Sequence, residues 1–519
     1  MITEFIAVRG RAGAGKTKYI MDTMVDYVKY AVYKPSEIAY LSYTKAAVEE
    51  GAERIIELGF NDLKDIHGFR TLHSLCFRLL KLKPFQIMQY QDYRKVCDQL
   101  GLRLRFEQIW KTREDAHTFY NPDSAEGNQF ISIYDYHRNS LKELEFPVGL
   151  SLGRYQQFVE ILENYKAENT MLDFTDFLQV ILTKNIVTDF KVIFVDEYQD
   201  ITPLAAKAID HICVTSEIET AFLVGDEAQT IYEFSGTTPD TFLQHPTIEE
   251  IDLNESHRIP AKLIGYVNSV FNRIENKKPA TLTTSSKIEG QIEYLSHRNQ
   301  ILQYLTQIPK TESIFILHRH IYGCKALGDF LLQNNILFKN TRGVSPLESL
   351  EHIAFRSRWQ YKQSQTLFTS GLQAILKLTK ADTAIMKRGT KTATMLLKKI
   401  QSFSYPALLE AGFKPEFFEL LLNAPATLFS SADKDLMKFF LNQPDSIYEN
   451  TPNITISTIH GVKGQEADHV FVFNELSQRT WKEFAKNQDS EHRVFYVAVS
   501  RTKKNLYIVK SHSPFIYPL

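Results

Sequence analysis

The stretch GRAGAGKT at residues 10–17 decides the fold, because it matches the pattern G-x-x-x-x-G-K-[ST] at every fixed position. The run Phe5–Val8 before it is short and apolar, as in a buried parallel strand, and residues 18–30 have a helical pattern. A loop between such a strand and helix turns backbone N–H groups and a helix N-terminus toward phosphates. The pattern therefore predicts a nucleoside triphosphate site. A glycine-rich turn that binds nothing is the alternative interpretation.

Two side chains of this loop have specific expected roles. Lys16 is expected to reach the β- and γ-phosphates, and the Thr17 hydroxyl to occupy one position on Mg²⁺. A second apolar run, residues 192–195, ends in Asp196-Glu197. An aspartate at a strand end suits a Mg²⁺ ligand, and the adjacent glutamate suits a base that activates water. The two stretches together predict hydrolysis of the triphosphate.

Composition limits the class of protein. The 519 residues predict three to four domains, and 44% apolar with 23% charged content is ordinary for a globular chain. The 60 basic and 61 acidic side chains nearly cancel, so a polyanion must be held by a local basic groove. The four cysteines are far apart, and no apolar run approaches the ~18 residues of a membrane span. We expect a reduced, intracellular (cytoplasmic) protein without a membrane partner.

The hydrophobic pattern predicts two α/β sheets, each interrupted by a mainly helical insertion. The first insertion covers about residues 84–190, and the second covers about a hundred residues after Ser345. The strands are expected at residues 38–41, 192–195, 221–224 and 251–253 in the first sheet, and at 314–317, 455–457, 470–473 and 506–509 in the second. Apolar runs that end in carboxylates, as at 192–200 and 221–229, are typical of the ligand-binding edge of a parallel sheet.

In these motifs and in their order the chain resembles a superfamily 1 DNA helicase of the UvrD/Rep kind. Besides the phosphate loop, the motifs that carry the resemblance are Ser42–Ala47, Thr71–Ser74, Leu172–Phe174, Asp196–Asp200, Gly225–Tyr232, Ser256–Arg258, Thr458–Gly464 and Tyr496–Arg501. The resemblance implies an α/β fold with two RecA-like P-loop motor domains, which have parallel sheets and a mainly helical insertion each. The implied boundaries are 1–84 and 189–256 for the first motor domain, 85–188 for its insertion, 257–345 and 451–519 for the second motor domain, and 346–450 for its insertion.

The resemblance also implies a set of site residues. Catalytic roles fall on Lys16, Glu197, Gln229, Arg258 and Arg501, where Gln229 senses the γ-phosphate and both arginines reach it from the second motor domain. Guanidinium groups that arrive as two domains close stabilise charge on the γ-phosphoryl oxygens. ATP is expected to contact Gly10, Ala12, Gly13, Ala14, Gly15, Lys16, Thr17, Lys18, His257, Arg258, Glu466 and Arg501, and Mg²⁺ to contact Thr17 and Asp196. An ordinary salt bridge is the alternative for each arginine.

Nucleic acid is expected to cross both motor domains, where aromatic side chains stack on bases regardless of sequence. The residues expected to bind DNA are Tyr43, Thr44, Thr71, His73, Tyr232, Phe234 and His460. A place in the core is the alternative for a lone aromatic residue. A basic group in the second insertion is a candidate duplex contact or a solvated helix face: Lys377, Lys380, Lys387, Arg388, Lys391, Lys398 and Lys399.

The resulting hypothesis is an ATP- and Mg²⁺-dependent DNA helicase that moves along single-stranded DNA, 3′ to 5′ as the resemblance suggests. Its expected partners are single-stranded DNA, junctions with duplex, and a single-strand-binding, nuclease or replication protein. The alternative is an ATP-gated DNA-binding switch or scaffold in a repair, recombination or defence complex. Three departures from the pattern of the UvrD/Rep family bear on these hypotheses. Little sequence precedes Gly10 for an adenine-reading glutamine motif. His257 stands where relatives have a tyrosine, and Ser235 stands where they have an arginine.

Overall fold

The computed structural model describes residues 3–42, 45–57, 67–105, 125–143, 146–147, 149–340, 345–379, 382–397, 399, 401–431, 433–448 and 451–519. The chain packs as two compact units, each built from two separate stretches. The first unit is Met1–Lys287 with Phe484–Ser500, and the second unit is Ile288–Glu483 with Arg501–Leu519. The predicted assignment of residues 257–345 to a second motor domain stays a prediction. In the structure the part of this segment up to Lys287 packs with the first unit.

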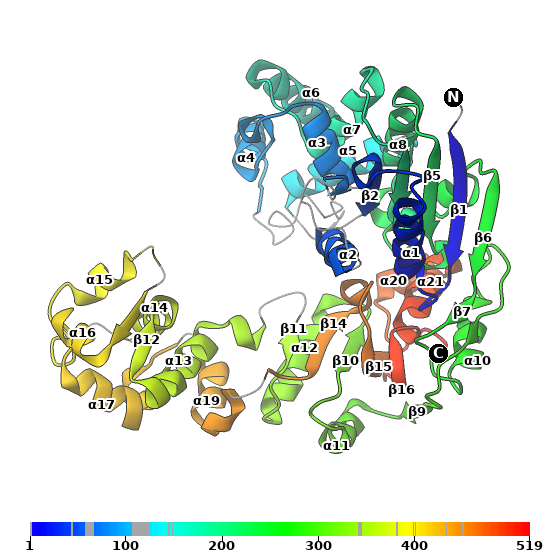
Figure 1. Ribbon diagram of the computed structural model, residues 1–519. Coiled ribbons are helices and arrows are strands. Elements are labelled where there is room, and N and C mark those ends of the chain that lie inside the picture. The colour runs from blue at the N-terminus through cyan, green and yellow to red at the C-terminus, as the bar shows by residue number, and fades with distance from the viewer. Residues whose placement is uncertain are drawn as a thin grey trace. The chain divides into compact units, whose positions relative to one another are not determined.

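The first unit is built on a six-stranded sheet in which all paired strands are parallel (Figure 1). The strand order is β3-β2-β4-β5-β1-β6. The strands are β1 (Glu4–Gly10), β2 (Ile38–Ser42), β3 (Phe69–Thr71), β4 (Val192–Val195), β5 (Thr220–Gly225) and β6 (Glu249–Leu253). The functional motifs follow the carboxyl ends of β1, β4 and β5, so one edge of the sheet collects them.

Helices cover both faces of this sheet, because successive strand residues point to opposite sides. Val8, Phe194 and Phe222 pack with helix α1 on one face, while Ala7, Val195 and Leu223 pack with α3, α7 and α8 on the other. The helices outside the insertion are α1 (Lys16–Lys29), α2 (Lys45–Glu57), α3 (Leu72–Leu79), α8 (Pro203–Thr215), α9 (Asp240–Leu243), α10 (Ile264–Phe271) and α21 (Gln488–Val499), with the short strands β7 (Glu255–Ser256) and β8 (Thr283–Thr284).

The first insertion is helical, as expected. Its helices are α4 (Tyr90–Gln99), α5 (Glu126–Ser140), α6 (Leu152–Asn169) and α7 (Phe174–Thr183). α4, α5 and α6 surround a core of their own that includes Tyr93, Phe130 and Phe158, while α7 packs toward the sheet.

The second unit contains another six-stranded parallel sheet, in the order β11-β14-β10-β15-β16-β9. Its strands are β9 (Gln291–Leu295), β10 (Ile314–His318), β11 (Lys339–Asn340), β14 (Ile454–Thr458), β15 (Ala467–Phe473) and β16 (Thr502–Val509), and its helices outside the insertion are α11 (Ile301–Gln307), α12 (Ile321–Gln333) and α20 (Gln478–Phe484). Ile316 and Phe471 pack under α11 and α12 on one face. Two parallel sheets with helical layers confirm the predicted α/β fold class.

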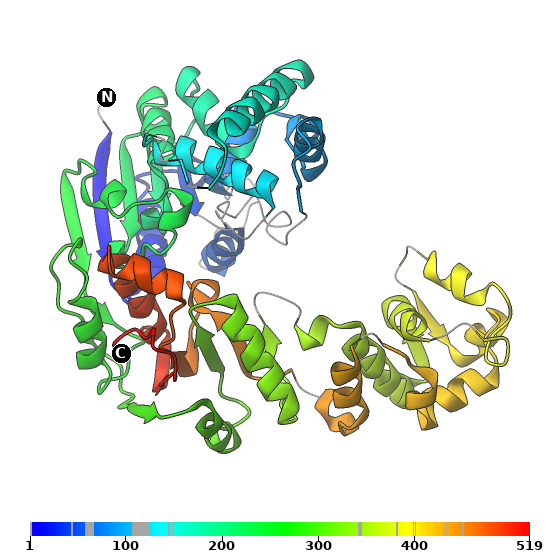
Figure 2. The ribbon, with the colours of Figure 1, turned by 180° about the vertical axis from the view of Figure 1, so that it is seen from behind.

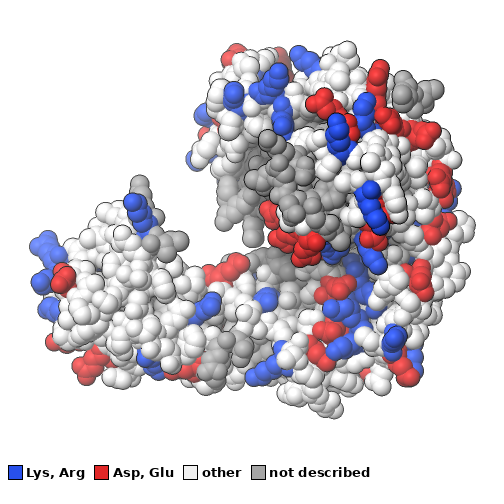
Figure 3. All heavy atoms as spheres, viewed as in Figure 1, with Lys and Arg blue, Asp and Glu red and all other residues white. Residues whose placement is uncertain are grey.

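The second insertion has a separate aromatic-rich core around Phe355, Phe417 and Phe440, and its yellow and orange helices are best seen in Figure 2. The helices are α13 (Leu350–Ser364), α14 (Thr369–Leu378), α15 (Thr390–Met395), α16 (Tyr405–Glu410), α17 (Pro415–Asn423), α18 (Pro425–Leu428) and α19 (Lys434–Leu441), and a two-stranded antiparallel ribbon joins β12 (Thr366–Phe368) to β13 (Ser402–Ser404). Figure 3 shows basic side chains along its left rim, with acidic ones among them. No helix in the described part of the chain is long and apolar enough to cross a membrane.

Candidate functional site: a phosphate loop and the strand ends around it

The phosphate loop is shaped by contacts that only glycine permits. A Cβ on Gly10 would lie 2.1 Å from Cγ of Lys16, and the Lys16 ammonium donates to the Gly10 carbonyl oxygen at 3.0 Å. Gly13 and Gly15 both have left-handed backbones, with φ of 75° and 77°. L side chains rarely adopt this conformation, so these two positions favour glycine. The loop predicted from GRAGAGKT is therefore present between β1 and α1.

Helix α1 begins at Lys16, two residues earlier than expected, and no described side chain caps it at Gly15. The first N–H groups of a helix have no partner within the helix, and the helix dipole adds partial positive charge there. The loop residues expected to contact the nucleotide all lie at this end: Gly10, Ala12, Gly13, Ala14, Gly15, Lys16, Thr17 and Lys18. Backbone N–H groups and the Lys16 ammonium at the N-terminus of this helix are suited to bind the phosphates of a nucleotide.

Asp196 and Thr17 come together at the carboxyl end of β4. The Thr17 hydroxyl donates to Oδ2 of Asp196 at 3.5 Å, and the hydroxyl of Tyr40 from β2 donates to the same oxygen at 2.8 Å. Burial, with the charge of Glu197, raises the pKa of Asp196 to about 6. A carboxylate, a hydroxyl and a second nearby carboxylate are oxygen donors that Mg²⁺ prefers, so these residues fit the expected ion. The contact of Tyr40 could not be predicted from the sequence, because a tyrosine in a buried strand carries no motif.

Glu197 has an unusual backbone, a left-handed φ of 53° in a residue other than glycine. Such a conformation costs about 1–3 kcal/mol, and strained residues of this kind cluster at active sites. Its carboxylate accepts a short hydrogen bond from the Gln199 amide, and the Gln199 amide oxygen accepts from the Asp226 backbone N–H at 2.9 Å. The side chain expected to activate water is thus tied to the loop after β5.

Gln229 lies in that loop and is buried. Its amide nitrogen donates to Oδ2 of Asp226 at 2.7 Å, which fixes the orientation of the side chain. The motif Gly225–Tyr232 therefore places Gln229 on the same sheet edge as the phosphate loop.

His257 and Arg258 lie against the phosphate loop within the first unit. A Cβ on Gly13 would come within 2.7 Å of the Arg258 Cβ, and the His257 N–H donates to the Gly13 carbonyl oxygen at 2.9 Å. A hydrogen bond of 2.6 Å joins His257 Nδ1 to the Ser285 hydroxyl, and the ring lies beside Gly15. Both residues therefore lie beside the phosphate loop, and their contacts with the nucleotide stay a prediction.

Arg501 and Glu466 belong to the second unit. Arg501 is 2% exposed and donates from Nη1 to the Gln465 carbonyl oxygen at 3.3 Å. Glu466 is exposed and lies 3.5 Å from the Lys503 ammonium. The Arg501 guanidinium therefore lies against the backbone next to Glu466, and the expected contacts of both residues with the nucleotide stay a prediction.

The residues expected to bind DNA differ in their surroundings. Thr71 is buried and caps α3 by accepting from the Ser74 N–H at 3.2 Å, which is a structural task. Burial lowers the pKa of His73 to about 4, so the imidazole is neutral at pH 7. Tyr232 and Phe234 are partly exposed and meet edge to face at 5.9 Å. Tyr43 and Thr44 lie outside the described residues.

The remaining expected DNA contact, His460, follows β14 in the second unit and is 7% exposed. Of the basic group in the second insertion, Lys380 and Lys398 lie outside the described residues. The others are exposed or partly exposed: Lys377, Lys387, Arg388, Lys391 and Lys399.

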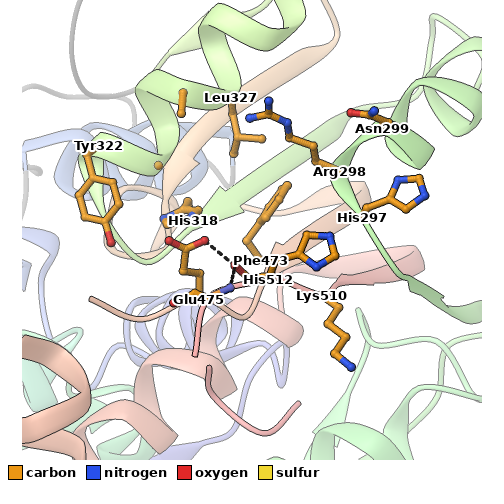
Figure 4. A pocket seen from close by; sticks show the side chains of 14 residues that line it. His297, Arg298, Asn299, His318, Tyr322, Leu327, Phe473, Glu475, Lys510 and His512 are labelled. Carbon is orange, nitrogen blue, oxygen red and sulfur yellow. Dashed lines mark hydrogen bonds between the residues drawn. The ribbon is translucent and has the colours of Figure 1, made fainter. Parts of the chain in front are cut away.

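The second unit has a cavity of about 810 Å³ that the sequence analysis missed. It opens at the carboxyl ends of β10 and β15, whose last residues, His318 and Phe473, line it (Figure 4). After β10 the chain continues to β11 on one side of the sheet, and after β15 it continues to β16 on the other side. The gap between β10 and β15 is therefore the topological switch point of the sheet, the place where open α/β sheets bind ligands. Tyr322 lies on one side of the cavity, and Lys510 lies on the opposite side.

These features define a nucleotide hydrolase of the P-loop class with two parallel α/β sheets. Two family models match the chain: the UvrD/REP helicase N-terminal domain over residues 2–247 and the UvrD-like helicase C-terminal domain over residues 432–513. The chain belongs to the UvrD/Rep-like superfamily 1 helicases, which are ATP-hydrolysing enzymes.

Curated relatives match over nearly the whole chain at low identity. A probable DNA helicase II homolog of Mycoplasma pneumoniae is 23% identical, covering 98% of this chain and 82% of the relative. The ATP-dependent DNA helicase PcrA of Staphylococcus aureus strain Mu50 is 21% identical, and the match covers 99% of this chain and 82% of the relative. The probable DNA helicase II homolog of Mycoplasma genitalium is 24% identical, and the match covers 96% of this chain and 81% of the relative.

Proposed function

We propose that this helicase couples ATP hydrolysis to movement along single-stranded DNA in the 3′ to 5′ direction. The observation that carries the proposal is the convergence of Lys16, Asp196, Glu197 and Gln229 on one edge of the first sheet, with Arg258 against Gly13. Charge that develops on a γ-phosphoryl group is stabilised by a lysine, an arginine and a metal placed around it.

Each residue has a distinct proposed task. Lys16 leaves its hydrogen bond with the Gly10 carbonyl oxygen to pair with the β- and γ-phosphates, while Arg258 and Arg501 neutralise the γ-phosphate. Glu197 accepts the proton of the attacking water, and Gln229 orients that water or the phosphate. When bound by Thr17 and Asp196, Mg²⁺ supplies charge neutralisation of the phosphate oxygens. His257 stacks on the base, and Glu466 contacts the ribose.

DNA is proposed to contact both sheets at their carboxyl edges. In the first unit the partly exposed rings of Tyr232 and Phe234 offer stacking surfaces. In the second unit the cavity beside β10 combines the exposed ring of Tyr322 with the cations Arg298 and Lys510, a combination that suits a phosphodiester chain with bases. Exposed Lys387 and Arg388 in the second insertion add a candidate duplex contact.

The first test is the rate of ATP hydrolysis with and without single-stranded DNA. We expect strong stimulation by DNA, and an unstimulated rate would contradict the motor. Glu197→Gln should retain nucleotide and DNA binding and lower kcat by about 10²- to 10⁴-fold, because a general base is lost. Wild-type hydrolysis by this variant would remove Glu197 from its role.

Direction needs a second assay, the unwinding of partial duplexes with a 3′ or a 5′ single-stranded tail. We expect unwinding of the 3′-tailed substrate, and preference for the 5′ tail would reverse the proposed direction. DNA-stimulated hydrolysis without unwinding of either substrate would favour the ATP-gated switch or scaffold.

A further inference from the structure

Two arginines flank Gly10 in the phosphate loop, and both are buried with carboxylates. Arg11 is 1% exposed, and from Nη1 it donates to Asp226 Oδ1 at 2.8 Å and Glu227 Oε1 at 2.9 Å. Its Nη2 donates to the Lys278 carbonyl oxygen at 3.1 Å. Burial alone would lower the pKa of Arg11, but the charges of Asp226 and Glu227 raise it above its ordinary value. Arg11 therefore links the phosphate loop to the loop after β5 by charged hydrogen bonds, which are the strong ones.

The other carboxylate oxygen of Asp226 has different partners. Oδ2 accepts from the Gln229 amide at 2.7 Å and from the Tyr496 hydroxyl at 3.4 Å. Asp226 is fully buried, so water does not compete for these bonds. The Asp226 carboxylate thus bonds to Arg11 of the phosphate loop, to Gln229, the expected phosphate sensor, and to Tyr496 of a helix that is distant in the sequence.

Tyr496 makes a second link to the phosphate loop. Its hydroxyl accepts from the Ala12 backbone N–H at 3.2 Å, and its ring packs against Phe271 with centroids 5.4 Å apart. Tyr496 lies in α21, which ends at Val499, two residues before Arg501. Movement of α21 therefore acts on both the Ala12 N–H and Asp226.

We propose that Arg11, Asp226 and Tyr496 are positioning residues that set the orientation of Gln229 and transmit the position of α21 to the hydrolytic site. Asp226 holds the amide nitrogen of Gln229, so the amide oxygen faces away from this carboxylate. Arg11, from the phosphate loop, holds the Oδ1 atom of Asp226, and Tyr496, from helix α21, donates to the Oδ2 atom. This inference rests on the proposed role of Gln229 in hydrolysis.

Tyr496→Phe is the sharpest variant, because it removes one hydroxyl and keeps the ring against Phe271. We expect kcat for ATP in saturating single-stranded DNA to fall about tenfold, with the KM for ATP changed less than about twofold. Arg11→Lys keeps the charge but loses the fork of donors, so we expect a smaller loss of kcat than in Arg11→Gln. Arg9→Lys is the comparison variant, since Arg9 is equally buried and lies 3.8 Å from the other carboxylate oxygen of Glu227, but it donates to the Phe242 carbonyl oxygen and Glu250 and not to Asp226.

A double-mutant cycle with Gln229→Ala separates positioning from general stability. If Tyr496 acts through Gln229, Tyr496→Phe lowers kcat little further in the Gln229→Ala background. Independent, multiplicative losses would overturn the inference, as would wild-type kcat in Tyr496→Phe or an equal loss in Arg9→Lys. Thermal melting of each variant shows whether Arg11→Gln has lost its fold. If it has, the kcat values of Arg11→Lys and Tyr496→Phe test the inference instead. Absence of DNA-stimulated hydrolysis in the wild type would instead contradict the proposed function.

Discussion

At the scale of single residues, Gly10 has no room for a side chain, because a Cβ there would lie 2.1 Å from Cγ of Lys16. We expect Gly10→Ala to displace Lys16 from the loop and to weaken nucleotide binding at least tenfold. Isothermal titration with a non-hydrolysable ATP analogue measures the affinity. The matched control is Gly153→Ala in α6, where an added Cβ meets nothing within 4 Å. Unchanged affinity in Gly10→Ala would contradict the role assigned to this contact.

A second prediction at this scale concerns the cavity of the second unit. Tyr322 is 53% exposed, and Lys510 is also exposed, so substitution of either should leave the fold intact. Tyr322→Ala should weaken binding of single-stranded DNA by about 1–3 kcal/mol, because base stacking is lost. Lys510→Ala should reduce the slope of log K against log salt by about 0.7. Fluorescence anisotropy with a labelled oligonucleotide at several salt concentrations measures both.

Lys438, on α19 of the second insertion, offers a control lysine away from the cavity. Lys438→Ala should leave the affinity for single-stranded DNA nearly unchanged. If Tyr322→Ala and Lys510→Ala bind DNA as tightly as the wild type does, the cavity is not part of the DNA path.

At the scale of elements, a buried ionic cluster joins three helices of the first insertion. Asp173, the N-cap of α7, lies 2.7 Å from Arg138 of α5 and 3.3 Å from Lys166 of α6, and Asp176 pairs with both cations. The charges of Arg138 and Lys166 outweigh burial and hold the pKa of Asp173 below its usual range. Breaking a buried pair leaves a charge without compensation.

Asp173→Asn tests this cluster, because asparagine still caps a helix but carries no charge. We expect local stability to fall by about 3 kcal/mol, measured as faster hydrogen exchange in α5, α6 and α7. The exposed pair of Glu126 and Arg154 is the control, and Glu126→Gln should cost less than about 1 kcal/mol. Equal effects of the two substitutions would show that burial of the cluster does not matter.

At the scale of the whole molecule, the partly buried histidines His73 and His320 should make stability depend on pH. Burial lowers the pKa of His73 to about 4 and that of His320 to about 3, and His320 accepts from the Ser477 N–H at 2.8 Å. Below about pH 6.5 the unfolded chain binds protons that the folded chain excludes, so stability falls as the pH drops from there toward 4.

The measurement is the melting temperature between pH 7.5 and pH 5. His320→Gln keeps a hydrogen-bond acceptor but removes the titration, so its melting temperature should fall less over this range. The difference corresponds to on the order of 1 kcal/mol at pH 5. Parallel curves for the wild type and His320→Gln would show that folding does not lower the pKa of His320.

Much of the fold could be predicted from hydrophobic runs and motifs. The strands expected at 192–195, 221–224, 314–317 and 470–473 are all present as β4, β5, β10 and β15. The edge strands β3, β9 and β11 and the ribbon β12–β13 could not be predicted from apolar runs. β3, β11, β12 and β13 span only two or three residues, and β9, with the sequence QIEYL, interrupts its apolar residues with a glutamate. The phosphate loop and Asp196-Glu197 were found because their chemistry needs fixed residue types at fixed spacing.

The amino-acid sequence alone determined the nucleotide chemistry and the two-sheet α/β class, since both depend on local patterns and on residues close together in the chain. Only the tertiary structure decided that Arg11, Asp226 and Tyr496 meet, and that Tyr40 reaches Asp196. These partners are separated by 156 or more positions, and no spacing rule relates them. The parallel sheet brings Arg11, Tyr40, Asp196 and Asp226 together because it collects the carboxyl ends of distant strands at one edge, and Tyr496 reaches them from helix α21.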